Sequence, residues 1–204
     1  MSYIPQDAVV QKLGANAGLI STKDAYDLET QNKYSKEGQL ELLNTTTVSS
    51  VSSHDYTVSG IPTLLDYDIH FLTFMNIVPS NSSPFAMNFL LADTTNSADT
   101  SSVYRFSHRY IADSGGSADE NTTTSNIYMS ANSGFPINGY AYIFNLRSAG
   151  IRTMITYYTQ TDNQARFGSG LHDNAKGTSG IRLRNHNGSG NFSGTLSLYG
   201  LRTA

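Results

Sequence analysis

Alternation of apolar and polar residues is clearest near the C-terminal end of the sequence, over residues 191–201. Phe192, Leu196 and Leu198 fall on one face together with two glycines, and hydroxyl-bearing residues fall on the other face. A period of two predicts a half-buried β-strand, and the glycines favour a bulge or a close approach between backbones. Because the sequence ends three residues after this segment, we expect the strand to lie between strands formed earlier in the chain.

The same period of two recurs from about residue 40 onward, and it predicts about nine or ten strands in all. The predicted strands cover residues 39–48, 54–58, 67–77, 85–91, 103–112, 127–131, 140–146, 151–159, 180–184 and 191–201. A spacing of about 10 to 18 residues is typical of an antiparallel jelly-roll-like β-sandwich. Residues 113–125 and 167–174 are expected to be loops. The predicted fold is therefore all-β over residues 39–204, with a short, partly helical N-terminal arm before it.

Two pairs of predicted strands are close enough in sequence to form hairpins. Residues 140–146 are expected to pair with 151–159, and residues 180–184 with the last strand. Each pair is separated by a short connection that contains glycine and serine.

The predicted strand 67–77 is the longest apolar run of the chain. Leu72 and Phe74 make its second half apolar on both faces. Such a strand is central in its sheet, or another surface covers its outer side. One face is expected to carry five apolar residues: Tyr67, Ile69, Phe71, Met75 and Ile77.

Residues 1–38 differ from the rest, because their basic residues are all lysines whereas those after residue 100 are nearly all arginines. A short helix is predicted over residues 7–13, and a second helix from Ser21 or Thr22 to about Tyr34. Its apolar face is too narrow to fold alone. The segment therefore either packs on its own domain or forms an arm that orders against a neighbouring subunit or a larger scaffold. In the second case six apolar residues would make the anchoring contacts: Ile4, Leu13, Leu19, Ile20, Ala25 and Leu28.

Composition excludes several classes of function. The net charge of −3 offers no basic surface for nucleic acid. No apolar run approaches the ~20 residues that span a bilayer, so no membrane insertion is expected. The absence of cysteine removes disulfides and thiolate metal sites. No signal peptide is recognised at the N-terminus, so synthesis in a cytoplasm is expected.

No catalytic constellation emerges from the polar residues. Asp66, Asp68 and His70 are spaced to share one strand face, which would suit a metal or acid–base cluster, but spacing alone does not make a site. The acidic loop at residues 113–121 matches no calcium-loop spacing. The histidines are scattered, and no nucleophile elbow occurs. We therefore expect a non-enzyme that has no catalytic residues, no metal and no cofactor.

Tyrosines are the other candidate functional residues. Tyr140, Tyr142, Tyr157 and Tyr158 lie on two strands expected to be adjacent, where they would form a platform for a glycan. The alternative role is sheet packing or a subunit interface, in which tyrosine is also enriched.

Several segments resemble small virion proteins of tailed bacteriophages, particularly phages of aquatic bacteria. The likeness covers residues 17–28, 38–43, 69–74 and 180–184, and the ending Phe-Ser-Gly-Thr-Leu-Ser-Leu-Tyr-Gly at residues 192–200. The Gly-Thr-Leu-Ser-Leu-Tyr-Gly part recurs in tail-fibre-like and other virion surface proteins. The resemblance brings no catalytic residues.

What the resemblance implies is a structural protein of the virion, made in the host cytoplasm and released by lysis. Its N-terminal arm would bind other virion proteins, capsid or tail subunits, and leave the sandwich outward as a head decoration or a tail-fibre component. Such proteins commonly form homotrimers or larger symmetric oligomers, which would cover the doubly apolar half of strand 67–77. The alternative function is a tail adhesin that recognises a host surface glycan.

Overall fold

The computed structural model describes residues 40–81, 83–92, 97–130, 135–146, 150–173, 177–186 and 190–201, with backbone only for 119–122. By its internal contacts the chain divides into two units, Met1–Glu37 and Gly38–Ala204. The account below concerns the second unit. The predicted N-terminal helices and the six anchoring residues lie outside the described residues.

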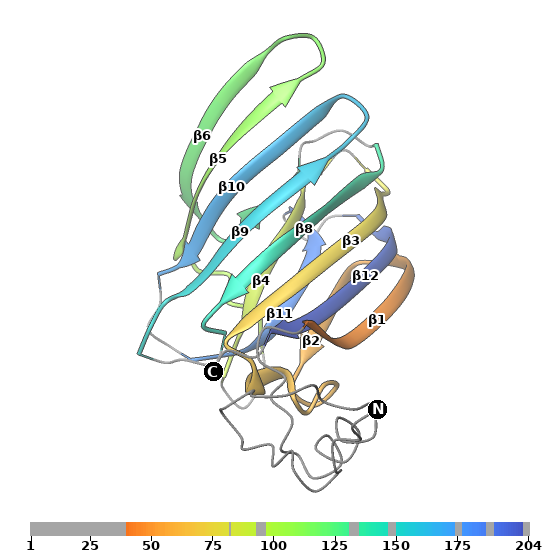
Figure 1. The fold of residues 1–204 in the computed structure, drawn as a ribbon. Coiled ribbons are helices and arrows are strands. Elements are labelled where there is room, and N and C mark those ends of the chain that lie inside the picture. Colours follow the sequence, from red (N-terminus) through yellow and green to blue (C-terminus); the bar gives the residue numbers. More distant parts are fainter. Residues whose placement is uncertain are drawn as a thin grey trace, which may run out of the picture. The chain divides into compact units, whose positions relative to one another are not determined.

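Twelve strands in two antiparallel sheets make up the described part of the chain (Figure 1). In order across the larger sheet they are β1 (Leu40–Val51), β12 (Phe192–Leu201), β3 (Ile69–Pro79), β8 (Ile137–Phe144), β9 (Thr153–Gln160), β10 (Gln164–His172), β5 (Tyr104–Ala112) and β6 (Ser117–Thr124). The smaller sheet runs β2 (Ser53–Thr57), β11 (Thr178–Asn185), β4 (Phe85–Leu91) and β7 (Ile127–Tyr128). A short 3-10 helix, η2 (Leu64–Asp66), precedes β3.

The order of the strands is that of a jelly roll with two inserted hairpins. Without β5, β6, β9 and β10, the larger sheet reads first, eighth, third and sixth strand, and the smaller sheet reads second, seventh, fourth and fifth. That order is the eight-stranded jelly roll with its two Greek keys. The prediction of an all-β, antiparallel jelly-roll-like sandwich is confirmed.

The inserted strands extend the larger sheet past β8. Figure 1 shows β9, β10, β5 and β6 side by side beyond β8. Strands β6 and β10 occupy segments that were expected to be loops, and that expectation was wrong. Their polar or glycine-rich sequences carry little alternation, yet β5 and β9 offer them full hydrogen-bonding ladders. Gly168 of β10 also permits a close approach, because a Cβ there would lie 2.4 Å from the Cβ of His108.

Strand β12 lies between β1 and β3, as its alternation and position predicted. Phe192, Leu196 and Leu198 are buried. Gly194 adopts a φ of +148° where the register with β3 shifts, which is the expected bulge. At Gly200 a Cβ would lie 2.4 Å from the ring of Tyr67, so this glycine makes room for a side chain and not for a neighbouring backbone. The predicted hairpin of β8 with β9 is confirmed, whereas β11 and β12 belong to different sheets, so that hairpin prediction was wrong.

Strand β3 changes the face it presents part-way along its length. His70, Leu72 and Phe74 point into the core, and the register with β8 then shifts so that Ile77 points inward as well. Asn76 takes a positive φ of 51° at this irregularity, and its N–H donates to Oδ1 of Asn138 at 2.8 Å. The single apolar face predicted for this strand was therefore wrong. Its outward positions are nevertheless apolar too, as its doubly apolar sequence indicated.

The core lies between the two sheets. It consists of inward residues of the jelly-roll strands and of the inserted strands β5 and β9, and its largest fully buried side chains include Tyr56, Tyr67, Tyr104, Phe74, Phe85, Phe89 and Phe192. Phe85 contacts both Phe74 and Phe192, with ring centroids 5.6 and 5.4 Å apart. Aromatic rings from both sheets thus interlock across the layer.

Candidate binding surface

Asp66, Asp68 and His70 do not form a cluster. Asp66 belongs to η2 and is exposed, while His70 is fully buried on β3. The His70 Nε2–H donates to the carbonyl of Leu64 at 2.6 Å. Burial lowers the pKa of His70, against smaller raising effects of that hydrogen bond and of Asp68. The prediction that the three residues share a strand face was therefore wrong, and His70 serves the core.

A second buried histidine, His172, connects β10 to the segment that follows β4. The Nε2–H of His172 donates to Asp99 Oδ2 at 2.9 Å, and both side chains are almost completely buried. The Tyr104 hydroxyl donates to the Asp99 carbonyl at 2.9 Å. Burial is the main cause that raises the pKa of Tyr104. This carboxylate–imidazole pair is thus engaged in holding the fold together.

A third histidine stands in a chain of hydrogen bonds on the inner side of the inserted hairpins. The Arg166 guanidinium donates to His108 Nε2 at 3.0 Å, and His108 Nδ1–H donates to the Tyr157 hydroxyl at 2.8 Å. That hydroxyl donates to the Tyr128 carbonyl at 2.8 Å. Arg166 also lies over the ring of Tyr110, 5.2 Å from its centroid. The chain ties β10, β5 and β9 to β7.

Within the described residues, no group of three histidine, cysteine, aspartate or glutamate side chains is placed to hold a metal ion. Asp119, Glu120 and Asn121, expected in a loop, lie in strand β6. In the same part of the chain, no helix is long and apolar enough to cross a membrane.

The outward face of the larger sheet carries a surface without charged residues. The registers of β1, β12, β3, β8 and β9 give twenty outward positions in four rows of five, the fourth of which is interrupted between β3 and β8 by their register shift, and no residue among them is charged. We call these positions the uncharged face. Its rows are Leu40, Leu201, Ile69, Phe144 and Met154; Leu42, Tyr199, Phe71, Tyr142 and Thr156; Thr45, Ser197, Thr73, Tyr140 and Tyr158; and Thr47, Thr195, Met75, Asn138 and Gln160.

Aromatic rings gather at the centre of the uncharged face. The ring of Phe71 lies 4.7 Å from that of Tyr142, 5.9 Å from that of Tyr140 and 6.0 Å from that of Tyr199, between centroids. Tyr140 and Tyr158 stack with centroids 5.8 Å apart. Phe71 and Tyr199 were not among the predicted site residues. Their place beside Tyr142 depends on strand order, which local alternation does not encode.

The predicted tyrosine platform is only partly assembled. Tyr140, Tyr142 and Tyr158 share the outward face, but Tyr157 is only 3% exposed and points into the core. Placing Tyr157 on the platform was wrong. Successive residues of a strand face opposite sides, so the alternation itself already separates Tyr157 from Tyr158.

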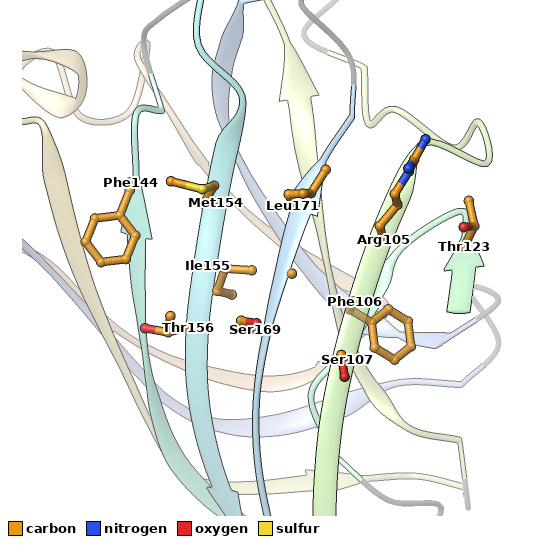
Figure 2. Close-up of a pocket in the computed structure, with 11 residues that line it drawn as sticks. Arg105, Phe106, Ser107, Thr123, Phe144, Met154, Ile155, Thr156, Ser169 and Leu171 are labelled. Carbon is orange, nitrogen blue, oxygen red and sulfur yellow. The ribbon is translucent and has the colours of Figure 1, made fainter. Parts of the chain in front are cut away.

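Next to the uncharged face, a shallow groove crosses the inserted strands. Its floor is a row of three hydroxyl-bearing residues, Thr156, Ser169 and Ser107, which pair across β9, β10 and β5. Met154, Leu171 and Arg105 rise along one side, as Figure 2 shows, and enclose a depression of about 500 Å³. A second depression shares Ser107 and Ser169 and reaches Phe167 and Arg109 on the other side. We call this feature the hydroxyl groove.

Charged side chains lie beside this groove. Arg105 and Arg152 both bind Asp173, at 2.5 and 2.7 Å, and both arginines are well exposed. The outward surface of the sheet thus has two parts, an uncharged aromatic one and a polar one with arginines.

Comparison of the chain with protein-family models, with curated proteins and with solved structures finds no match. The functional argument therefore starts from the chemistry of these surfaces.

Proposed function

We propose that the protein is a non-enzymatic structural component of the surface of a phage virion, as a head decoration or a tail-fibre-associated protein. The observation that carries the proposal is the uncharged face. A contiguous outward surface of this size without a charged residue marks a site of protein–protein contact. The resemblance of the sequence to phage virion proteins suggests that the assembly in which this contact occurs is a virion.

The internal polar groups support a structural role. His70, His108 and His172 are each buried and hydrogen-bonded to groups of the fold. They stabilise the sandwich and its inserted hairpins, and they do not meet in one cleft. In the proposal, residues 1–38 anchor the chain to capsid or tail subunits and the sandwich points outward.

The proposal is tested in particles of the phage that encodes the chain. Mass spectrometry of purified virions should detect the protein, and cryo-electron microscopy should place it on the head or the tail. The full-length double variant Leu19→Asp, Ile20→Asp should leave the circular dichroism spectrum of the sandwich unchanged and lose incorporation. Purified virions that lack the wild-type protein would refute a virion role. Normal incorporation of the double variant would refute anchoring through these residues.

A second candidate function is a tail adhesin for a host surface glycan, and the hydroxyl groove favours it. Hydroxyl groups both donate and accept hydrogen bonds, as sugar hydroxyls do. Exposed apolar side chains such as Phe167 stand beside them. A glycan array with the wild-type protein and with Phe167→Ala tests this function. Binding that the substitution abolishes would support it, and a blank array together with unchanged adsorption of particles lacking the protein would refute it.

A further inference from the structure

We infer that a second copy of this chain covers the uncharged face, so that two copies pack larger sheet against larger sheet about a two-fold axis. The inference rests on the proposed function only in taking this face as an assembly surface. It does not depend on the assignment to a virion.

The first step is the exposure of apolar side chains on this face. Ten large hydrophobic residues are exposed among the described residues, and five of them belong to the uncharged face. They are Leu40, Leu42, Met75, Tyr140 and Met154, with exposed fractions of 50, 56, 62, 42 and 44%. Leu40 and Leu42 lie at one edge of the face and Met154 at the other, and the half-buried rings of Phe71, Tyr142 and Tyr199 lie between them. Single exposed hydrophobic residues are ordinary, but an apolar group of this extent marks a contact surface.

The second step is the identity of the occupant. A two-fold axis places a surface against itself, so that a charge close to the axis meets the same charge of the other copy, and a charge elsewhere needs an opposite charge at the matching position of the same surface. The uncharged face avoids this repulsion at all of its twenty positions. A partner chosen by charge complementarity would leave basic or acidic residues at such positions, and none is present. The face is therefore suited to a copy of itself.

The third step is size. Strands about 4.8 Å apart and same-face residues about 6.8 Å apart give the five strands and four rows a span of about 24 by 27 Å. The projected area is then about 650 Å² for each copy, and a pair would bury about 1,300 Å² in total. Specific protein interfaces begin at about 1,200 Å². The uncharged face alone is thus large enough for a stable pair.

The fourth step is the surroundings of the patch. Charges on the outward side of the sheet begin at the inserted hairpins, where Arg105 and Arg109 project from β5. An apolar centre with a polar, charged rim is the usual build of a protein interface. In the pair, the hydroxyl groove would lie at this rim. The ring cluster around Phe71 packs against its own neighbours, which holds the centre of the interface in shape.

The test measures the mass of the purified full-length chain by size-exclusion chromatography with light scattering. The wild-type protein should run at 44.4 kDa, twice the 22.2 kDa chain. Raising the salt concentration should not reduce this mass, because the interface contains no charge pairs. Met75→Lys and Leu42→Lys each place two like charges in the interface, and each should halve the mass.

One substitution provides a control on the same sheet face. Ile111→Lys alters a residue that is exposed by 50% but lies on β5, which is separated from β9 by β10. This variant should keep the mass of the pair. A thermal melt of each variant verifies that it is folded.

A wild-type mass of 22.2 kDa at the highest soluble concentration would overturn the inference. Equal loss of mass in Ile111→Lys and Met75→Lys would overturn it too, because association would then involve the hairpin half. Both outcomes leave the particle experiments unaffected. Conversely, a pair in solution combined with absence from virions would refute only the proposed function.

Discussion

The jelly-roll strands and the inserted hairpins share one sheet, yet they are stabilised in different ways. Inward residues of the jelly roll are apolar and interlock with the smaller sheet, as Phe74 does with Phe85. Inward residues of the hairpins also include polar groups: Arg166 donates to His108, and His172 donates to Asp99. Outward residues differ as well, since the jelly-roll part is uncharged and the hairpin part carries arginines.

The two regions of the larger sheet differ because the smaller sheet packs against only part of it. The smaller sheet has four strands against eight in the larger one, and β10 and β5 lie beyond β8 and β9, on the side away from the other jelly-roll strands. Tyr110 and Arg166, at the far end of the hairpins, stay half-buried on the inner side. Near solvent, partly burying a polar side chain costs little free energy if the side chain is hydrogen-bonded. The inserted hairpins thus add apolar residues, such as Phe106 and Ile155, and hydrogen-bonded polar ones to the inner side of the sheet.

Loss of a jelly-roll core side chain should have the largest effect. Phe74→Ala removes a fully buried ring and should lower the free energy of unfolding by about 3–5 kcal/mol. Phe167→Ala, on β10 with 46% exposure, should cost less than about 1 kcal/mol. Urea unfolding of both variants at one protein concentration measures the difference. Equal costs would contradict the division of the sheet into two regions.

The hydrogen-bond chain of the hairpins should come next. Tyr157→Phe leaves the Tyr128 carbonyl and the His108 imidazole without the hydroxyl between them, and should cost about 1–3 kcal/mol in the free energy of unfolding. Its neighbour Tyr158 faces outward, where its hydroxyl donates to the exposed Gln160 at 3.1 Å. Tyr158→Phe should therefore stay within about 0.5 kcal/mol of the wild type. Similar costs for the two variants, by the same unfolding measurement, would refute the role of the chain.

Acid should weaken the jelly roll through its histidines. Burial is the largest cause that lowers the pKa of His54, His70 and His186 in the folded protein. Below about pH 6.5 the unfolded chain therefore binds more protons than the folded one, so stability falls as the pH falls, by up to about 1.4 kcal/mol per pH unit for each histidine.

His70→Gln should reduce this slope, because glutamine keeps an N–H donor for the Leu64 carbonyl and does not titrate. His186→Gln alters a more exposed residue and should change the slope less. Thermal melts of the wild type and both variants between pH 7.5 and 5 measure these slopes, a range that brackets the usual histidine pKa of about 6.5. An unchanged slope in His70→Gln would count against the buried neutral state of His70.

The smallest effect is expected at the edge of the hairpin network. Arg166→Met loses the contact with the Tyr110 ring and the hydrogen bond to His108, and should cost about 1 kcal/mol. Arg152→Met removes an exposed ion pair with Asp173 and should cost less than about 0.5 kcal/mol. Chemical unfolding of the two variants should rank them in this order. The reverse order would show that surface charge stabilises the hairpins more than their inner network does.

Alternation along the sequence was enough to predict the class of the fold and most of its strands. The segment at residues 191–201 predicted a buried strand with a bulge, because side-chain size and period are local properties. The doubly apolar stretch around Leu72 likewise indicated an outward surface in need of a cover. Both features are visible in the residues themselves.

Tertiary structure decided which faces and strands come together. Polar β6 and glycine-rich β10 become strands because β5 and β9, which precede them in the chain, supply hydrogen-bonding ladders, and β10 also pairs with the distant β5. The irregularity at Asn76 turns Ile77 inward, and strand order places Tyr199, Phe71 and Tyr142 in one row of the uncharged face. Register and neighbour order depend on contacts between residues far apart in sequence, and a period of two carries no information about them.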